Sequence, residues 1–322
     1  MENLDIQKLV EISRMYYNEH MTQEVISKYF SISRSAVSLC LAEAKNVGIV
    51  QIQINDPSQN NDLLGERMEK EFGLKKCIVV PSGSYNTNIL VHIVVSQAVR
   101  YALTLLKSHS CIGISWGNSC YEFMHTFPED TNLCDITVVP LIGISPLLTA
   151  EYQLNESVRK FAGKLRGNPL FIYSPGYVEN LKDKELIMKS DFMQPIFKRW
   201  QDVDFAVVGI GREQQRSEMR QYLCEGESLL QEIYGNPEIA VGDICARQFN
   251  IRGEFIENDH NSKLIGADKE ILGKINHVMA IAAGHEKVIP IIGALRTGIV
   301  HSLATDENTV IQILDSIKSL PG

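Results

Sequence analysis

The chain has 322 residues, of which 44% are hydrophobic and 22% charged, and its formal net charge is -8. At about 150 residues per domain, this length predicts roughly two domains with ample material for a core. A mean hydropathy of -0.06 is that of an ordinary soluble globular chain and excludes collagen-like, fibrous and disordered classes.

The sequence predicts neither a membrane segment nor a metal site. No apolar run reaches the roughly 18 residues of a membrane span, and acidic residues stand near the start, where a secretory signal would be basic and then apolar. We therefore expect a cytoplasmic protein. The seven cysteines are scattered without a C-x-x-C pair, and the eight histidines lack the spacing of metal ligands. We expect no metal and no cofactor.

Residues 1–55 predict a winged helix-turn-helix domain. Apolar residues recur at three- and four-residue steps over 5–17, as in an amphipathic helix. Thr22 is placed to cap a second helix, and Ser33 is placed to cap a third helix that ends at Gly48. The alternating run IVQIQIND then predicts a strand, as in a wing.

The start of the third predicted helix presents short donors beside one long bidentate donor. Hydroxyls and a guanidinium suit base edges and phosphates in a major groove. Between the helices, Ser31 stands where a left-handed backbone is needed and glycine is usual. The predicted DNA-binding residues are Thr22, Gln23, Ser33, Arg34, Ser35 and Ser38.

A three-helix bundle without a DNA role has the same apolar periodicity. Through Asn55, five basic residues stand against six acidic ones, a net charge of -1, whereas DNA-binding modules are usually basic. The charge of the face that meets DNA decides the affinity for DNA, however, and several DNA-binding domains on one operator strengthen a weak contact. DNA binding is therefore the prediction, and a head used only for protein contacts is the alternative.

The polar run DPSQNND predicts the boundary to a second domain over residues 56–322. Beyond it, the runs CIVVP, CIGIS, DITVVPLIG, PLFIYSP, DFAVVGIG and MAIAAG alternate with helical stretches. Several of these runs are apolar throughout, as in strands that are buried on both faces. The pattern predicts a mostly parallel α/β sheet covered by helices.

Several predicted strand ends carry residues that suit a small ligand, because open α/β sheets bind ligands at the carboxyl ends of their strands. After CIGIS, Gly117 allows a close backbone approach, and Trp116 can pack on a sugar face. Asn118 and Ser119 lie at a helix start, which attracts an anion such as phosphate. The alternative is an ordinary strand-to-helix turn.

Two other strand ends carry signals that are weak alone, and the segment beginning MAIAAGHEK, which holds Lys287, is more informative. VVPLIG ends in Gly143 with Ser145 just beyond, and DFAVVGIG ends in a glycine pair. Lys287 would put a cation beside a strand end, although a solvated lysine is the commoner case. Asp243 suits sugar hydroxyls or closes a turn, and Asp306 is expected to cap the last helix instead of contacting a ligand.

The order of YY…MTQ, GISWGNS, VVPLIGIS, VVGIG, AVGDI, AAGHEK and ALRTGIVHSLATDE resembles the SorC/DeoR-type family of bacterial sugar-responsive transcriptional regulators. The resemblance covers nearly the whole chain. It implies an effector domain similar in fold to glucosamine-phosphate deaminases and ribose-phosphate isomerases, which binds a sugar or sugar phosphate in a tetramer or dimer on operator DNA. The effector-binding residues it implies are Ser115, Trp116, Gly117, Asn118, Ser119, Gly143, Ile144, Ser145, Asp243 and Lys287.

The chain departs from the family at two places. The family has paired glycines where this chain has Gly143-Ile144 and Ala283-Gly284, and the side chain of Ile144 would narrow the pocket. PLIGIS contains no lysine that could form a Schiff base, so we expect non-covalent binding.

The rival function is a sugar-phosphate isomerase or deaminase with an appended helical domain. It needs a general base near the loops, and Asp243 and His285 are the only obvious candidates. Neither lies in a spacing that demands catalysis. The sequence therefore predicts a DNA-binding regulator of a carbohydrate-utilisation operon, not an enzyme.

Overall fold

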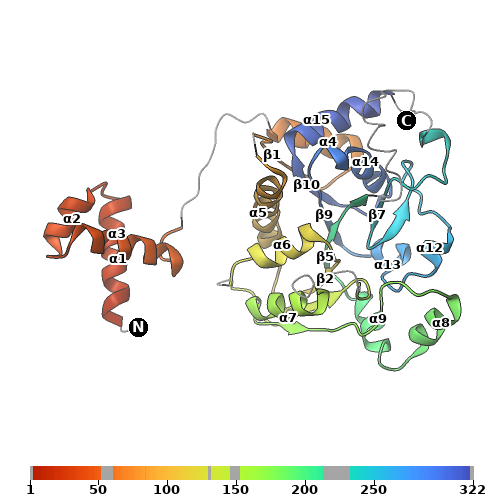
Figure 1. Ribbon diagram of the computed structural model, residues 1–322, viewed down its shortest axis with the longest axis horizontal. Coiled ribbons are helices and arrows are strands. Elements are labelled where there is room, and N and C mark those ends of the chain that lie inside the picture. Colours follow the sequence, from red (N-terminus) through yellow and green to blue (C-terminus); the bar gives the residue numbers. More distant parts are fainter. Residues whose placement is uncertain are drawn as a thin grey trace. The chain divides into compact units, whose positions relative to one another are not determined.

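The computed structural model describes residues 3–51, 61–83, 85–129, 132–145, 153–212 and 233–319. The chain divides into two compact units, residues 1–58 and 59–322, which we call the head and the sheet unit (Figure 1). Each unit has a hydrophobic core of its own.

Three helices form the head: α1 (Asn3–Tyr17), α2 (Gln23–Tyr29) and α3 (Arg34–Asn46). Its core consists of Ile12, Met15, Ile26, Val37 and Leu41. Both predicted N-caps are confirmed. The Thr22 hydroxyl accepts the Val25 backbone N–H at 3.3 Å, and the Ser33 hydroxyl accepts that of Ala36 at 3.1 Å.

The backbone between the helices also follows the sequence. Ser31 has a φ of +53°, the predicted left-handed conformation, and Gly48 has a φ of +79° just after α3. Of the predicted wing strand IVQIQIND, residues 49–51 form no strand, and 52–56 lie outside the described residues.

Seven parallel strands form the main sheet, in the order β1-β10-β9-β5-β2-β3-β4. Their bounds are β1 (Lys76–Val80), β2 (Cys111–Ile114), β3 (Thr137–Pro140), β4 (Asn168–Pro169), β5 (Phe205–Gly209), β9 (His277–Ile281) and β10 (Ser302–Asp306). Every residue of β2 and β10 is buried, as expected for parallel strands covered on both faces. The predicted parallel α/β fold is therefore confirmed.

The run PLFIYSP is the exception, because it does not form the strand predicted for it. Only Asn168 and Pro169 pair with β3, as the two-residue edge strand β4. Proline has no backbone N–H to donate to a ladder, and Pro169 and Pro175 bracket this run.

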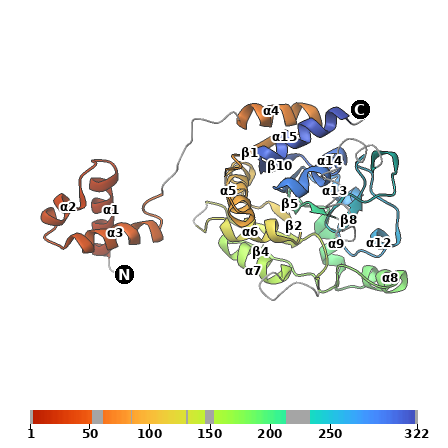
Figure 2. The ribbon, with the colours of Figure 1, turned by 45° about the horizontal axis from the view of Figure 1, so that its top comes forward.

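Helices cover both faces of the sheet (Figures 1 and 2). On one face, α5 (Thr87–Leu105), α6 (Asn118–Thr126) and α7 (Leu154–Lys164) contact one another in series. On the other face lie α4 (Asn61–Phe72), α14 (Val288–Arg296) and α15 (Glu307–Ser316). Shorter elements are α8 (Leu181–Lys189), α9 (Gln194–Trp200), α12 (Asp259–Ser262), α13 (Lys269–Leu272), η2 (His285–Lys287) and η3 (Ile317–Ser319).

Among the described helices, α5 alone is long and apolar enough, by length and composition, to cross a membrane. This was not expected from the sequence. Its buried side chains belong to the core of the sheet unit, and they are Val94, Val95, Ala98, Val99 and Ala102. Burial against the sheet accounts for the apolar character of this side of the helix.

A small antiparallel sheet, β6 (Gly211–Arg212), β7 (Gly242–Ile244) and β8 (Arg247–Phe249), follows the carboxyl end of β5. Cys245 and Ala246 join β7 to β8 with φ values of +52° and +59°, which is the two-residue hairpin turn that matches strand twist. In this sheet Gly211 pairs with Asp243.

Candidate functional site

The sheet changes its direction of winding beside β5. The chain leaves β2 for α6 on one face, and it leaves β9 for α14 on the other. Because β2, β5 and β9 are neighbours in the sheet, their carboxyl ends meet where open α/β sheets bind ligands. The loops after these three strands contain predicted effector residues.

Two of these loops use a glycine in a conformation that other residues rarely adopt. Gly117 has a φ of +114° just before α6, and Gly284 has a φ of +106° just before η2. No side chain caps α6. The first N–H groups of this helix, at Asn118 and Ser119, are therefore available to an anion.

Lys287 reaches from η2 to the neighbouring strand end. Its Nζ donates to the carbonyl of Ile210 at 2.7 Å. Burial lowers the pKa of Lys287, whereas Glu286 and Asp243 act to raise it and Arg212 to lower it. A cation held in partly buried surroundings beside an acid is a suitable partner for a polar, charged ligand.

The carboxylate of Asp243 lies directly against the backbone of Gly211. A Cβ atom at Gly211 would stand 1.7 Å from Asp243 Oδ2. Glycine at 211 therefore leaves the room that the Asp243 carboxylate occupies.

Ser115 has a structural position within the predicted site. The residue is 1% exposed, and its side chain hydrogen-bonds Cys245, whose pKa burial raises to about 12. Ser115 thus holds the β7–β8 hairpin to the loop after β2. Trp116 is partly buried, and its ring lies beside Gly176, where a Cβ atom would be 2.9 Å from it.

The loop after β3 is fixed by its backbone. The N–H of Gly143 donates to Ile265 at 2.9 Å, and that of Ile144 donates to Ser174 at 2.8 Å. A Cβ atom at Gly143 would lie 2.3 Å from the Pro175 carbonyl oxygen. Ser145 is partly buried and continues the same loop.

Asp306 caps α15, as predicted. It is 2% exposed and accepts hydrogen bonds from Ser82 Oγ at 2.8 Å, from the Gly284 N–H at 2.8 Å and from the Thr309 N–H at 3.2 Å. These bonds fix the loop after β9. His285, a candidate base of the rival enzyme, is exposed and hydrogen-bonded to Gln312.

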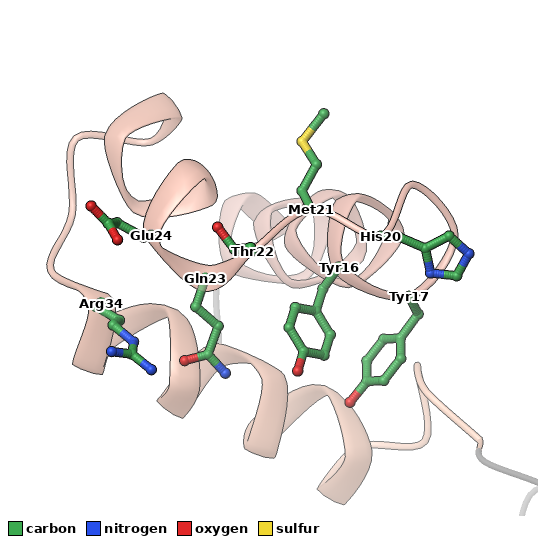
Figure 3. A pocket seen from close by; sticks show the side chains of 8 residues that line it. All are labelled: Tyr16, Tyr17, His20, Met21, Thr22, Gln23, Glu24 and Arg34. Carbon is green, nitrogen blue, oxygen red and sulfur yellow. The ribbon is translucent and has the colours of Figure 1, made fainter.

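The head presents its predicted DNA contacts on its surface. Gln23 is partly buried, and the other five are exposed. A hollow of about 750 Å³ is lined by Tyr16, Tyr17, His20, Met21, Thr22, Gln23, Glu24 and Arg34. Figure 3 shows that Gln23 and Arg34 extend toward the same side. The cap oxygens of Thr22 and Ser33 accept backbone N–H groups, and the Ser33 and Ser35 hydroxyls hydrogen-bond each other at 2.9 Å.

A family model, described as a putative sugar-binding domain, matches residues 56–315. The chain belongs to the SorC/DeoR-type family of sugar-responsive transcriptional regulators. It is 28% identical to the sorbitol operon regulator of Klebsiella pneumoniae, over 98% of this chain and 100% of that protein. It is 27% identical to the deoxyribonucleoside regulator of Bacillus subtilis (strain 168), over 96% and 97%.

Solved structures of transcriptional regulators have a similar fold. The crystal structure of the full-length sorbitol operon regulator from Klebsiella pneumoniae is similar with a TM-score of 0.76 at 26% identity, over 96% of this chain and 99% of that one. A transcriptional regulator from Streptococcus pneumoniae TIGR4 is similar with a TM-score of 0.70 at 25% identity, over 80% and 98%.

Two further residues lie beside the family site: Arg212, which follows the run DFAVVGIG singled out in the sequence, and Cys245, which was not among the candidates. Arg212 acts electrostatically on Lys287, and Cys245 holds Ser115. Arg212 directly follows the glycine pair after β5, so a basic residue at that strand end was a readable signal. Nothing in the sequence pairs Cys245 with Ser115, because they belong to distant segments.

Proposed function

We propose that the chain is a DNA-binding transcriptional regulator of a carbohydrate-utilisation operon, whose operator binding is controlled by a sugar or sugar phosphate. The similarity to a full-length regulator over 96% of this chain carries the proposal, because it includes both the head and the sheet unit. The head, residues 1–55, binds operator DNA, and residues 56–322 bind the effector and form a homo-oligomer, a tetramer or dimer.

The effector binds at the carboxyl ends of β2, β5 and β9. The uncapped start of α6 and the cation of Lys287 suit an anionic or electron-rich group, and Asp243 accepts hydrogen bonds from sugar hydroxyls. The remaining implied residues, Trp116 and the loop 143–145, form the walls. The binding is non-covalent.

Effector binding changes how the sheet units associate and thereby the spacing of the heads. The coupling requires only that the effector binds the DNA-competent and DNA-incompetent arrangements with different affinity. Such coupling is reciprocal, so operator DNA must change the affinity for the effector by the same factor. The protein works in the cytoplasm.

A thermal-shift screen of the full-length protein against sugars and sugar phosphates tests the effector site. A ligand at 100 times its Kd stabilises the folded state by about 2.7 kcal/mol. The active compound should also change the affinity for a labelled operator. A compound that stabilises the protein and leaves its DNA affinity unchanged would contradict the regulatory part of the proposal.

The regulator is proposed to bind its effector without converting it. Supporting this, His285 is exposed and bonded to Gln312, and the Lys287 ammonium, on which the Asp243 charge acts, is engaged with a backbone carbonyl. Incubation of the purified protein with the active sugar phosphate should return the compound unchanged. Turnover would favour the isomerase or deaminase instead.

A further inference from the structure

The recognition helix α3 has one face in the core of the head and another in solvent. Its buried residues are Val37, Leu41 and Ala44. The opposite face carries exposed residues at three- and four-residue steps, which are Ser35, Ser38, Leu39 and Ala42. We call these four residues the reading face.

Leu39 is the only large apolar side chain of the reading face, and it is 71% exposed. Single exposed leucines are common on protein surfaces, so its exposure alone assigns no role. Its neighbours do. Ser35 and Ser38 supply hydroxyls beside it, and Ala42 adds only a methyl group, so the reading face lacks the contiguous apolar area of a protein-binding patch.

Two exposed cations stand at the ends of the helix. Arg34 and Lys45 are 11 residues apart, which is about 16 Å along a helix axis and more than the roughly 12 Å width of the major groove. Lys45 Nζ lies 5.9 Å from the centre of the Tyr17 ring. The acid on this helix, Glu43, is partly buried and follows Leu39 by one turn. Arg34 can thus contact the operator at the start of the helix, and Leu39 lies between the two cations along the axis.

We infer that Leu39 reads thymine, by packing against its C5-methyl group in the major groove of the operator. This inference rests on the proposed DNA-binding function. Leucine has no hydrogen-bond donor or acceptor for a base edge, and the thymine methyl is the apolar group that unmodified DNA displays in this groove. Arg34 and the serines supply the hydrogen bonds, and Leu39 supplies the apolar contact.

The test uses the full-length protein and a duplex that it selects from a random-sequence library. Each thymine is replaced in turn by uracil, which removes only the methyl group. At one or two positions the wild-type protein should lose affinity about four-fold, the value of one buried methyl. Leu39→Ala should bind the thymine duplex about ten-fold more weakly and lose nothing further at those uracil positions.

Leu63→Ala is the matched control, because Leu63 is a 57% exposed leucine on α4 in the sheet unit. It should keep the wild-type affinity for the thymine duplex, and it should lose affinity at the same uracil positions as the wild-type protein. We call this loss of affinity the uracil penalty. Leu39→Gln is a second variant, which keeps the length of the side chain and should also lose the penalties. Alanine and glutamine are good helix formers, so both variants keep α3.

Uracil penalties that persist at full size in Leu39→Ala would overturn the inference. So would an altered oligomeric state of Leu39→Ala in sedimentation with unchanged DNA affinity, because this places Leu39 in a contact between copies. If the wild-type protein selects no duplex at all, DNA binding itself fails, which is a separate result.

Discussion

The two candidate surfaces of this chain are built in opposite ways. The predicted DNA contacts come from one short segment, and five of the six are exposed. The candidate effector residues come from distant segments, and several are already engaged, as Ser115 is with Cys245 and Lys287 with Ile210. Substitutions in the head should therefore change binding alone, whereas substitutions at the sheet edge should change binding and stability together.

Gly143→Ala should show the largest effect, on the sheet unit alone. The new methyl would meet backbone atoms, with the Pro175 carbonyl oxygen at 2.3 Å. We expect the free energy of unfolding to fall by about 3 kcal/mol. Both tryptophans, Trp116 and Trp200, belong to this unit, so their fluorescence in a urea titration follows it separately.

Gly163→Ala is the control for that change. Gly163 lies within α7, and a Cβ atom there meets nothing within 4 Å. This variant should be more stable than the wild-type protein by up to about 1 kcal/mol. Equal stabilities of the two variants would show that the loop after β3 yields readily and is no rigid wall.

Arg34→Ala should weaken operator binding by the head and leave the sheet unit unchanged. Loss of a bidentate contact should weaken operator binding by about 1–3 kcal/mol, or roughly 10- to 100-fold, and remove the preference for operator over random DNA. The unfolding curve and the effector affinity should stay as they are. Titration of labelled operator and random duplex measures the preference.

Arg14→Ala controls for loss of charge, since Arg14 is exposed on α1 and paired with Glu11 at 3.0 Å. Its removal should change operator affinity by less than about 0.5 kcal/mol. Undiminished discrimination by Arg34→Ala would refute the assignment of α3 as the reading helix.

Lys287→Met should change binding and stability together. Without the ammonium, affinity for the sugar phosphate that gives the largest thermal shift should fall about ten-fold, and Lys287→Glu should weaken it further through its charge. The Ile210 carbonyl also loses its donor, at about 1 kcal/mol of stability. Calorimetry gives the affinity and urea titration the stability.

Lys184 offers a matched lysine, because its Nζ donates to the Ser262 carbonyl at 2.6 Å in partly buried surroundings. Lys184→Met should lose a similar amount of stability and keep its affinity for the sugar phosphate. Equal affinity of Lys287→Met and the wild-type protein would remove Lys287 from the site.

The same contrast explains what the sequence could predict. Helix caps such as Thr22 and Ser33, the left-handed Ser31 and the apolar strands depend on neighbouring residues, and they are confirmed except for the strand predicted at PLFIYSP. The sheet edge was predictable as a place, because parallel strands bring their carboxyl ends together.

The contacts at that edge were not predictable in the same way. The bonds from Lys287 to Ile210 and from Ser115 to Cys245 depend on the strand order, which no local pattern states. Lys287 lies in a 3-10 turn, η2, directly before α14. Gly143, implied as an effector residue, and Gly211, from the glycine pair of DFAVVGIG, are needed for close approach to other groups.

Lowering the pH should have the smallest of these effects, a loss of stability in the sheet unit alone. At the amino end of β9, burial lowers the pKa of His277 to about 4, and Lys75 and His301 act in the same direction. The His277 ring stacks on Phe205 at 5.4 Å. The pKa of His301 is lowered by burial as well, and its Nδ1 accepts the Val278 N–H at 3.1 Å.

Because the folded pKa lies below the unfolded value of about 6.5, the unfolded chain takes up the proton first as the pH falls. The stabilisation is complete above about pH 6.5 and is lost down to about pH 4. After allowance for solvent screening, we expect about 1 kcal/mol less stability of the sheet unit at pH 5 than at pH 7. His277→Gln should flatten this dependence in tryptophan fluorescence. The one histidine of the head, His20, is exposed. We therefore expect the stability of the head to change little between pH 7 and pH 5. An equal loss of stability in the head would show that the two units do not respond separately.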